Sequence, residues 1–136
     1  MIVHSLDDAR AALSAVRAAG GSALLLASAP AAGCYAGSGW FAALLAVSRA
    51  EYPDIAIEAE LDCADQPGAV LAALRAGIDR IRFRGESAAA DRLREIAAER
   101  GAIFETGAAP AGLDLRGAAD PGTLCRAYLS GNARAS

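Results

Sequence analysis

The apolar positions of the chain fall into blocks of two kinds, which alternate from the first residue onward. Short apolar runs such as SALLLAS at 22–28 have the length and continuity of strands that are buried on both faces. Longer blocks place an apolar residue at every third or fourth position, as Leu6, Ala9 and Leu13 do, which predicts amphipathic helices. The expected strands are residues 1–4, 22–28, 55–62, 78–84 and 102–105.

Capping and helix-breaking residues mark the expected ends of the helices. Ser5 and Asp8 have the spacing of a capping pair, and Gly20 is expected to end the helix that they begin. Because strands and helices alternate, we expect an α/β fold whose parallel sheet has right-handed crossovers. The expected helices are residues 6–19, about 38–50, 65–76, 87–100 and 121–129, and residues 29–39 have the composition of a loop.

Length and composition exclude several classes of function. The 136 residues predict one domain, and their net charge of −3 gives no basic surface for nucleic acid and no charged tail for a membrane surface. The longest apolar run, 23–32, is too short to span a bilayer, and the N-terminus does not resemble a secretory signal. Three irregularly spaced cysteines favour reduced thiols and hence a cytoplasmic protein.

The most reactive pair of neighbours in the sequence is Asp62-Cys63, at the end of the third expected strand. The carboxyl ends of parallel strands are where reactive groups of α/β proteins gather. Asp62 is therefore a candidate general base, with a capping or ion-paired carboxylate as the alternative. Cys63 is a candidate metal ligand, with a small buried thiol as the alternative.

Several motifs occur in an order that points to one family. They are HSLDDARAAL at 4–13, Tyr35-Ala-Gly37 followed by Trp40-Phe41 and Glu51-Tyr-Pro-Asp54, Glu60-Leu-Asp-Cys63, Ile81-Arg-Phe-Arg-Gly85, and Ile103-Phe-Glu-Thr-Gly107. In this order and spacing, residues 4–107 resemble the N-terminal part of the class II, metal-dependent fructose-bisphosphate aldolase family. The resemblance covers about five of the eight strand–helix units of such a barrel.

The resemblance implies a TIM-type (βα) barrel fold with a divalent metal, usually zinc, near the strand ends. It places Asp62 on the family's proton-transferring aspartate and Glu105 on a metal-site glutamate. The chain also departs from the family: Cys63 and Ala64 replace the His and Gly of an Asp-His-Gly motif, and Arg84 replaces an acid. With its later strands missing, the chain is expected to form residues 1–107 as a partial barrel, followed by an extension at 108–136 whose one candidate helix is 121–129.

Alternate residues of the third and fourth expected strands are charged, with opposite signs on the two strands. Residues of one parity share a face, so acids and arginines are expected to meet in a ladder between the strands. A closed barrel would bury these charges at a cost of several kcal/mol each. We therefore expect an open sheet of about five parallel strands, with helices on one face and water, the C-terminal tail or another subunit on the other. The ladder residues are Glu58, Glu60 and Asp62 with Arg80, Arg82 and Arg84.

Three functions remain open at this point. The preferred hypothesis is a degenerate aldolase relative that binds, regulates or scaffolds without catalysis and without a cofactor. The second is a metal-dependent lyase for a sugar phosphate or similar carbonyl compound, with Asp62 as the catalytic residue, completed across a dimer. The third is a binder of a small anionic ligand. A homodimer, joined through the charged face or through Trp40 and its neighbours, is expected because an open sheet leaves a face and two edges exposed. The second hypothesis assigns zinc to Cys63, Glu105 and His4, and the third assigns the anion to Arg80, Arg82 and Arg84.

Overall fold

The computed structural model describes residues 1–135 and the side chains of residues 1–132. Five parallel strands form one open sheet in chain order, as predicted, and each strand end lies within two residues of its expected position. The prediction of an α/β, partial-barrel architecture is therefore confirmed. The strands are β1 (Ile2–Val3), β2 (Ala23–Ser28), β3 (Ala56–Asp62), β4 (Arg80–Phe83) and β5 (Ile103–Thr106).

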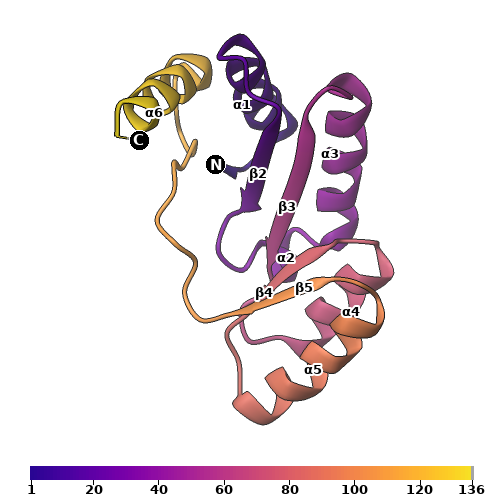
Figure 1. The fold of residues 1–136 in the computed structure, drawn as a ribbon. Helices are drawn as coiled ribbons and strands as arrows, with labels where there is room; N and C mark the ends of the chain where they lie inside the picture. The colour runs from indigo at the N-terminus through magenta and orange to yellow at the C-terminus, as the bar shows by residue number, and fades with distance from the viewer. Residues whose placement is uncertain (136) are drawn as a thin grey trace.

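One layer of helices covers one face of this sheet (Figure 1). Successive helices of the layer pack against one another, α1 on α3, α3 on α4 and α4 on α5. A sheet whose strands follow chain order, with crossovers of constant hand, must place all its crossover helices on the same face. The helices are α1 (Leu6–Ala18), α3 (Ser38–Glu51), α4 (Pro67–Arg75) and α5 (Ser87–Glu99).

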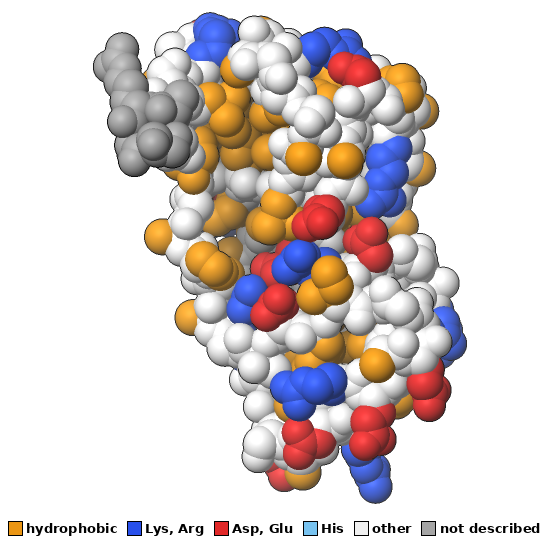
Figure 2. Space-filling view, in the orientation of Figure 1, with side chains coloured by type: hydrophobic (Ala, Val, Ile, Leu, Met, Phe, Trp, Pro, Cys, Tyr) orange, Lys and Arg blue, Asp and Glu red, His pale blue; other side chains and the backbone are white. Residues whose placement is uncertain are grey.

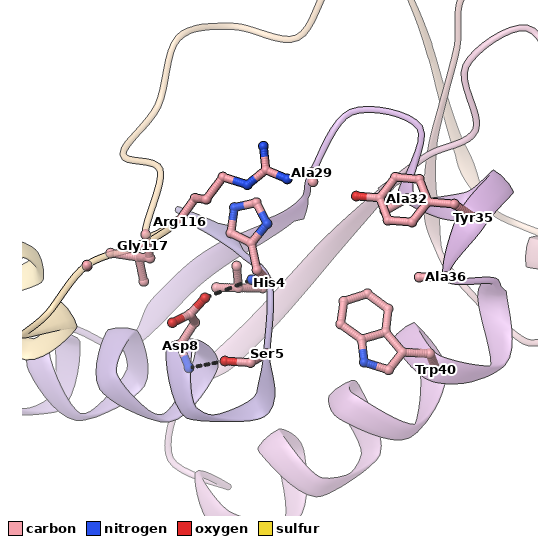
Figure 3. A pocket seen from close by; sticks show the side chains of 13 residues that line it. His4, Ser5, Asp8, Ala29, Ala32, Tyr35, Ala36, Trp40, Arg116 and Gly117 are labelled. Atoms are coloured by element: carbon pink, nitrogen blue, oxygen red, sulfur yellow. Dashed lines mark hydrogen bonds between the residues drawn. The ribbon is translucent and has the colours of Figure 1, made fainter.

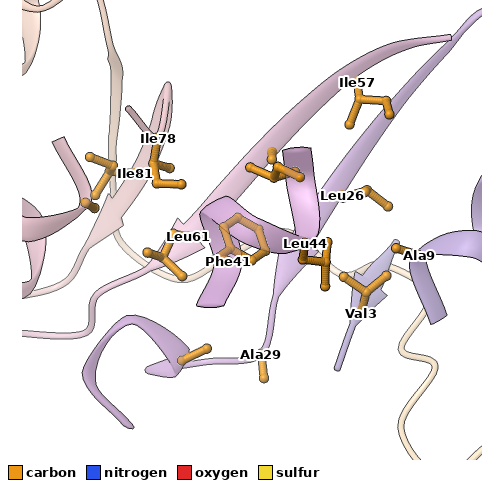
Figure 4. Close-up of a cluster of buried hydrophobic side chains, with 14 of the residues drawn as sticks. Val3, Ala9, Leu26, Ala29, Phe41, Leu44, Ile57, Leu61, Ile78 and Ile81 are labelled. Carbon is orange, nitrogen blue, oxygen red and sulfur yellow. The ribbon is translucent and has the colours of Figure 1, made fainter. Parts of the chain in front are cut away.

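The hydrophobic core lies between the helix layer and the sheet (Figure 4). Alternate strand residues point into it, so Leu26, Leu61 and Ile81 are fully buried while their neighbours face the other side of the sheet. Phe41 fills the centre from α3. Alanines on the inner faces of α1, α4 and α5 allow these helices to lie close to the strands.

The segment predicted as a loop at 29–39 contains one short helix, α2 (Ala32–Tyr35). Its brevity explains why no periodic pattern of apolar residues indicated it. Gly33 is required there, because a Cβ atom at this position would lie 3.0 Å from the backbone oxygen of Asp62 and 3.0 Å from Cys63 Sγ. The helix is thus held directly against the end of β3.

Residues 107–118, which we call the strap, leave β5 and pass over the face of the sheet opposite the helices (Figure 1). The strap ends beside β1 at the other edge of the sheet, where Ile2 and Asp114 form a parallel bridge. Ile2 N donates to Leu113 O at 2.7 Å, and Leu115 N donates to Ile2 O at 3.1 Å. The strap therefore joins the two edges of the open sheet.

The chain ends in α6 (Pro121–Ala135), which packs against α1 and buries Cys125. The predicted helix at 121–129 is confirmed and continues for six residues beyond its expected end. The sequence left open whether this helix or the rest of the tail covers the charged face. The strap covers it, and from α6 Tyr128 reaches its border. No helix within residues 1–135 has both the length and the apolar character needed to cross a membrane.

Candidate functional site

Ion pairs form the predicted ladder on the strap-covered face (Figure 2). Arg82 binds Glu60 with two parallel hydrogen bonds, Nε to Oε2 at 2.9 Å and Nη2 to Oε1 at 3.1 Å. Arg84 Nη2 donates to Asp62 Oδ1 at 3.0 Å. Arg80 reaches carboxylates on both sides, Glu58 at 3.2 Å and Glu105 at 3.3 Å. The arginines predicted to hold an anionic ligand are thus each paired with a carboxylate of the protein.

The ladder is diagonal rather than straight. The strand register places Arg82 beside Asp62, yet its guanidinium binds Glu60, two residues earlier on β3. Arg84 and Arg80 are displaced from their partners on β3 in the same sense, which keeps one acid for each arginine. Opposite charges at the diagonal distance are within reach because the arginine side chain is long.

Arg82 also anchors the strap. Its Nη1 atom donates to the carbonyl oxygens of Thr106, Gly107 and Ala108 at 3.2, 3.4 and 3.4 Å. Glu60 and Arg82 are each only 6% exposed, so the centre of the charged face is buried, whereas the side chains of Glu58, Glu105 and Arg84 are 61%, 41% and 37% exposed. A cavity of about 370 Å³ remains between the strap and the sheet. The C-terminal tail, one of the three coverings that the sequence left open, thus lies over part of this face.

Asp62, the predicted general base, is committed to structural contacts. Its Oδ1 atom accepts hydrogen bonds from Ala31 N at 3.0 Å, Ala64 N at 2.9 Å and the Arg84 guanidinium. Ala31 and Ala64 are the two non-glycine residues with positive φ in the described chain, at 62° and 49°. The carboxylate therefore stabilises two left-handed turns at the strand end, a conformation that L-residues rarely adopt without support.

Cys63 points away from Asp62, into the core beneath α2. Burial, reinforced by the neighbouring Cys34 and Asp62, raises the pKa of Cys63 to about 12. Burial also raises the pKa of Cys34, whose thiol donates to the backbone oxygen of Cys63 at 3.2 Å. Cys63 is therefore a neutral thiol at neutral pH, which is the protonation state least suited to binding a metal.

Alkylation of the native protein by iodoacetamide is expected to modify Cys34 slowly and to leave Cys63 and Cys125 unmodified. Only the thiolate reacts, and only Cys34 of the three cysteines is exposed. Raising the pH should speed the reaction of Cys34, because its raised pKa keeps the thiolate fraction small at neutral pH. Peptide mass spectrometry gives the modified fraction at each cysteine. Rapid modification of Cys63 in folded protein would contradict its burial.

The other predicted zinc ligands do not join Cys63. His4 follows β1 and contacts Asp114 of the strap, while Glu105 lies on β5 against Arg80. Within residues 1–135, no three side chains of His, Cys, Asp or Glu are grouped so that they could hold a metal ion. The residues present thus do not fit the zinc site that the resemblance implies.

A different site lies at the carboxyl ends of β1 and β2, where a cleft of about 540 Å³ opens (Figure 3). Four segments meet there: the start of α1, the segment 29–36, the first turn of α3 and the C-terminal end of the strap. Such a place at strand ends is where α/β folds bind ligands. The sequence did not predict this cleft, because the strap residues that complete it are distant in the chain.

One wall of the cleft is polar and centres on His4. Its Nε2 atom lies 2.6 Å from Asp114 Oδ1, and that oxygen also accepts from Arg116 N at 2.9 Å. Burial acts to raise the pKa of Asp114, but the hydrogen bonds from Arg116 and His4 outweigh it and hold the pKa below its usual value. Asp8 completes the wall, its carboxylate accepting from His4 N at 2.9 Å while Ser5 Oγ accepts from Asp8 N at 3.1 Å.

The facing wall is aromatic. Tyr35, at the end of α2, and Trp40, in the first turn of α3, lie across the cleft from His4 and Arg116 in Figure 3. Tyr35 is 67% exposed, which is unusual for a large aromatic side chain without a partner in the fold. Small residues between the two walls keep the cleft open, namely Ala29, Ala32 and Ala36.

Among the polar residues at this cleft, His4 is the one to which the sequence analysis assigned a function, as a candidate zinc ligand. Asp114 and Arg116 lie in a stretch rich in Gly, Ala and Pro, which gave no motif. Tyr35 entered the sequence analysis only through the family resemblance, and Trp40 entered it also as a possible surface for self-association. Comparison of the sequence with models of protein families gives no match, and comparison with curated proteins gives none either.

Proposed function

We propose that the chain is a non-catalytic small-molecule-binding protein, built on a degenerate, aldolase-like partial barrel, and that the cleft at the ends of β1 and β2 is its binding site. The observation that carries the proposal is a difference between the charged residues of the sheet, which are paired with one another, and those that line the cleft. Asp62 and the ladder arginines already form hydrogen bonds and ion pairs within the fold. The cleft, in contrast, presents the exposed side chains of Tyr35 and Arg116, which form no hydrogen bond with another described residue.

A fluorescence screen tests this function, because Trp40 is the only tryptophan and lines the cleft. We expect at least one class in a panel of anionic, cationic and neutral small molecules to shift Trp40 emission in a saturable way. A variant that fills the cleft, Ala36→Phe, should abolish that response. Ala43→Phe is the matched control, since Ala43 is an exposed residue of α3 outside the cleft. A panel without any saturable response would overturn the proposal.

The alternative function, a zinc-dependent lyase, predicts different results from the binding function. It requires stoichiometric zinc that is lost in Cys63→Ala, together with activity on a sugar phosphate that is lost in Asp62→Asn. Metal analysis of protein purified without chelators or a metal-affinity tag separates the two functions. The buried thiol, its raised pKa and the separation of His4 from Glu105 favour the binding function.

Self-association belongs to the same proposal, but we place it at an edge of the sheet rather than at the charged face or around Trp40, the surfaces that the sequence suggested. The charged face is covered by the strap, and the β1 edge is bridged by Asp114. The β5 edge is left for a second copy, and there Ile103 is 45% exposed. A homodimer joined along β5 would continue the sheet from one subunit to the other.

A further inference from the structure

We propose that the ligand of the cleft carries a flat ring and one anionic group, as a nucleoside monophosphate or an aromatic acid does. The proposal rests on the binding function proposed above and names the chemical class of its ligand. It follows from the two unlike walls of the cleft, one aromatic and one that presents the exposed guanidinium of Arg116.

The aromatic wall fits a flat ring. The side chains of Tyr35 and Trp40 come from neighbouring elements and border the same space (Figure 3). An exposed aromatic ring offers a stacking surface to any planar group, whatever its hydrogen-bonding pattern. The alanines between the walls leave room for a ring to enter edge-on.

The polar wall can bind an anion through Arg116, whose exposed guanidinium lines the cleft. This guanidinium forms no hydrogen bond with another described residue, and its charge acts at longer range on Asp114. The two carboxylates nearby have hydrogen-bond partners within the fold, Asp114 in His4 and the Arg116 backbone, and Asp8 in the His4 backbone. The Nδ1 atom of His4 is left without a partner among the described residues. A cationic ligand would meet Arg116, whereas a phosphate or carboxylate can accept from it in a bidentate fashion.

The size of the cleft agrees with a ligand of this kind. Its volume of about 540 Å³ lies inside the range in which proteins bind small organic molecules, about 300–1,000 Å³. A lone phosphate would leave most of this space to water, and the aromatic wall would have no contact.

The experiment compares four probes by quenching of Trp40: adenosine 5′-monophosphate, adenosine, inorganic phosphate and benzoate. Adenosine lacks the anion and phosphate lacks the ring, so each should bind at least about tenfold more weakly than the monophosphate. Benzoate tests whether a carboxylate on a single ring suffices. Tighter binding of the monophosphate would identify a nucleotide-like ligand, and tighter binding of benzoate an aromatic acid, and either result supports the proposed chemistry.

Two exposed residues can be changed without disturbing the core. Arg116→Gln should weaken the monophosphate about tenfold or more while leaving adenosine unchanged. Tyr35→Ala should weaken adenosine and the monophosphate by a similar factor and leave phosphate unchanged. Arg92→Gln, which removes the same charge from an exposed position on α5, is the control and should have no effect. Calorimetry on the same proteins checks that fluorescence reports binding.

Two outcomes would overturn the inference, and they differ from failure of the binding function. Equal affinities for the monophosphate and adenosine, or for the monophosphate and phosphate, would show that ring and anion are not both recognised. Saturable binding of only neutral or cationic compounds in the broader panel would keep the binding function and refute this ligand class. A panel in which nothing binds would refute both.

Discussion

Replacing Arg82 with methionine is expected to lower the free energy of unfolding by about 3–5 kcal/mol. The substitution leaves the Glu60 carboxylate, 6% exposed, without the two hydrogen bonds that neutralise it. An unpaired buried charge keeps its desolvation cost, whereas the pair had offset it. The same change frees three carbonyl groups where the strap begins, so the strap should also loosen.

Urea denaturation followed by circular dichroism measures the effect. The double variant Glu60→Leu with Arg82→Met removes both charges and should recover most of the lost stability, because no buried charge then lacks a partner. Arg92→Met, on the exposed face of α5, is the control for loss of an arginine. Hydrogen exchange of residues 107–112 should rise in both variants that lack Arg82. A loss below about 1 kcal/mol, typical of solvent-exposed ion pairs, would show instead that water reaches the ladder.

Replacing Asp62 with alanine is expected to cost about 3 kcal/mol of stability. One carboxylate oxygen accepts hydrogen bonds from two backbone N–H groups and the Arg84 guanidinium, so its removal leaves both N–H groups without this acceptor. Two left-handed alanines also lose the group that holds them in that conformation. Thermal and urea unfolding give the loss in stability.

Two further variants show whether this role is structural. Asp62→Asn keeps an acceptor oxygen for the two backbone N–H groups, so it should cost less than Asp62→Ala. Asp65→Ala, at the exposed carboxylate three residues on, should be near neutral. If Asp62→Ala were as stable as the parent protein, the carboxylate would not support the turns, and Asp62 would return to the candidates for a functional role.

The turn at Ala64 is a strained position beside Asp62. The φ of Ala64 is 49°. A glycine adopts this conformation without strain, so the turn would suit a glycine better than alanine. The hydrogen bond from Ala64 N to Asp62 offsets part of that strain.

The sequence by itself determined the secondary structure and the faces of the strands, whereas the strand order was an expectation that came from the family resemblance. Period-two and period-3.6 patterns are local, so the five strands and five of the helices could be located from neighbouring residues alone. The ladder likewise follows from the parity of the charged residues on β3 and β4, because parity in a strand determines which face a side chain occupies.

Only the tertiary structure decided what covers the ladder and where the cleft lies. The strap has almost no periodic pattern, and its position follows from hydrogen bonds to Ile2 and Arg82, which are far away in the sequence. The same contacts carry Asp114 to His4 and Arg116 into the cleft. Two further donors from other segments, Ala31 N and the Arg84 guanidinium, join Ala64 N at Asp62 and so make a structural residue of the predicted catalytic one. Local patterns specify what each segment becomes, whereas a site assembled from distant segments depends on how the chain folds back on itself.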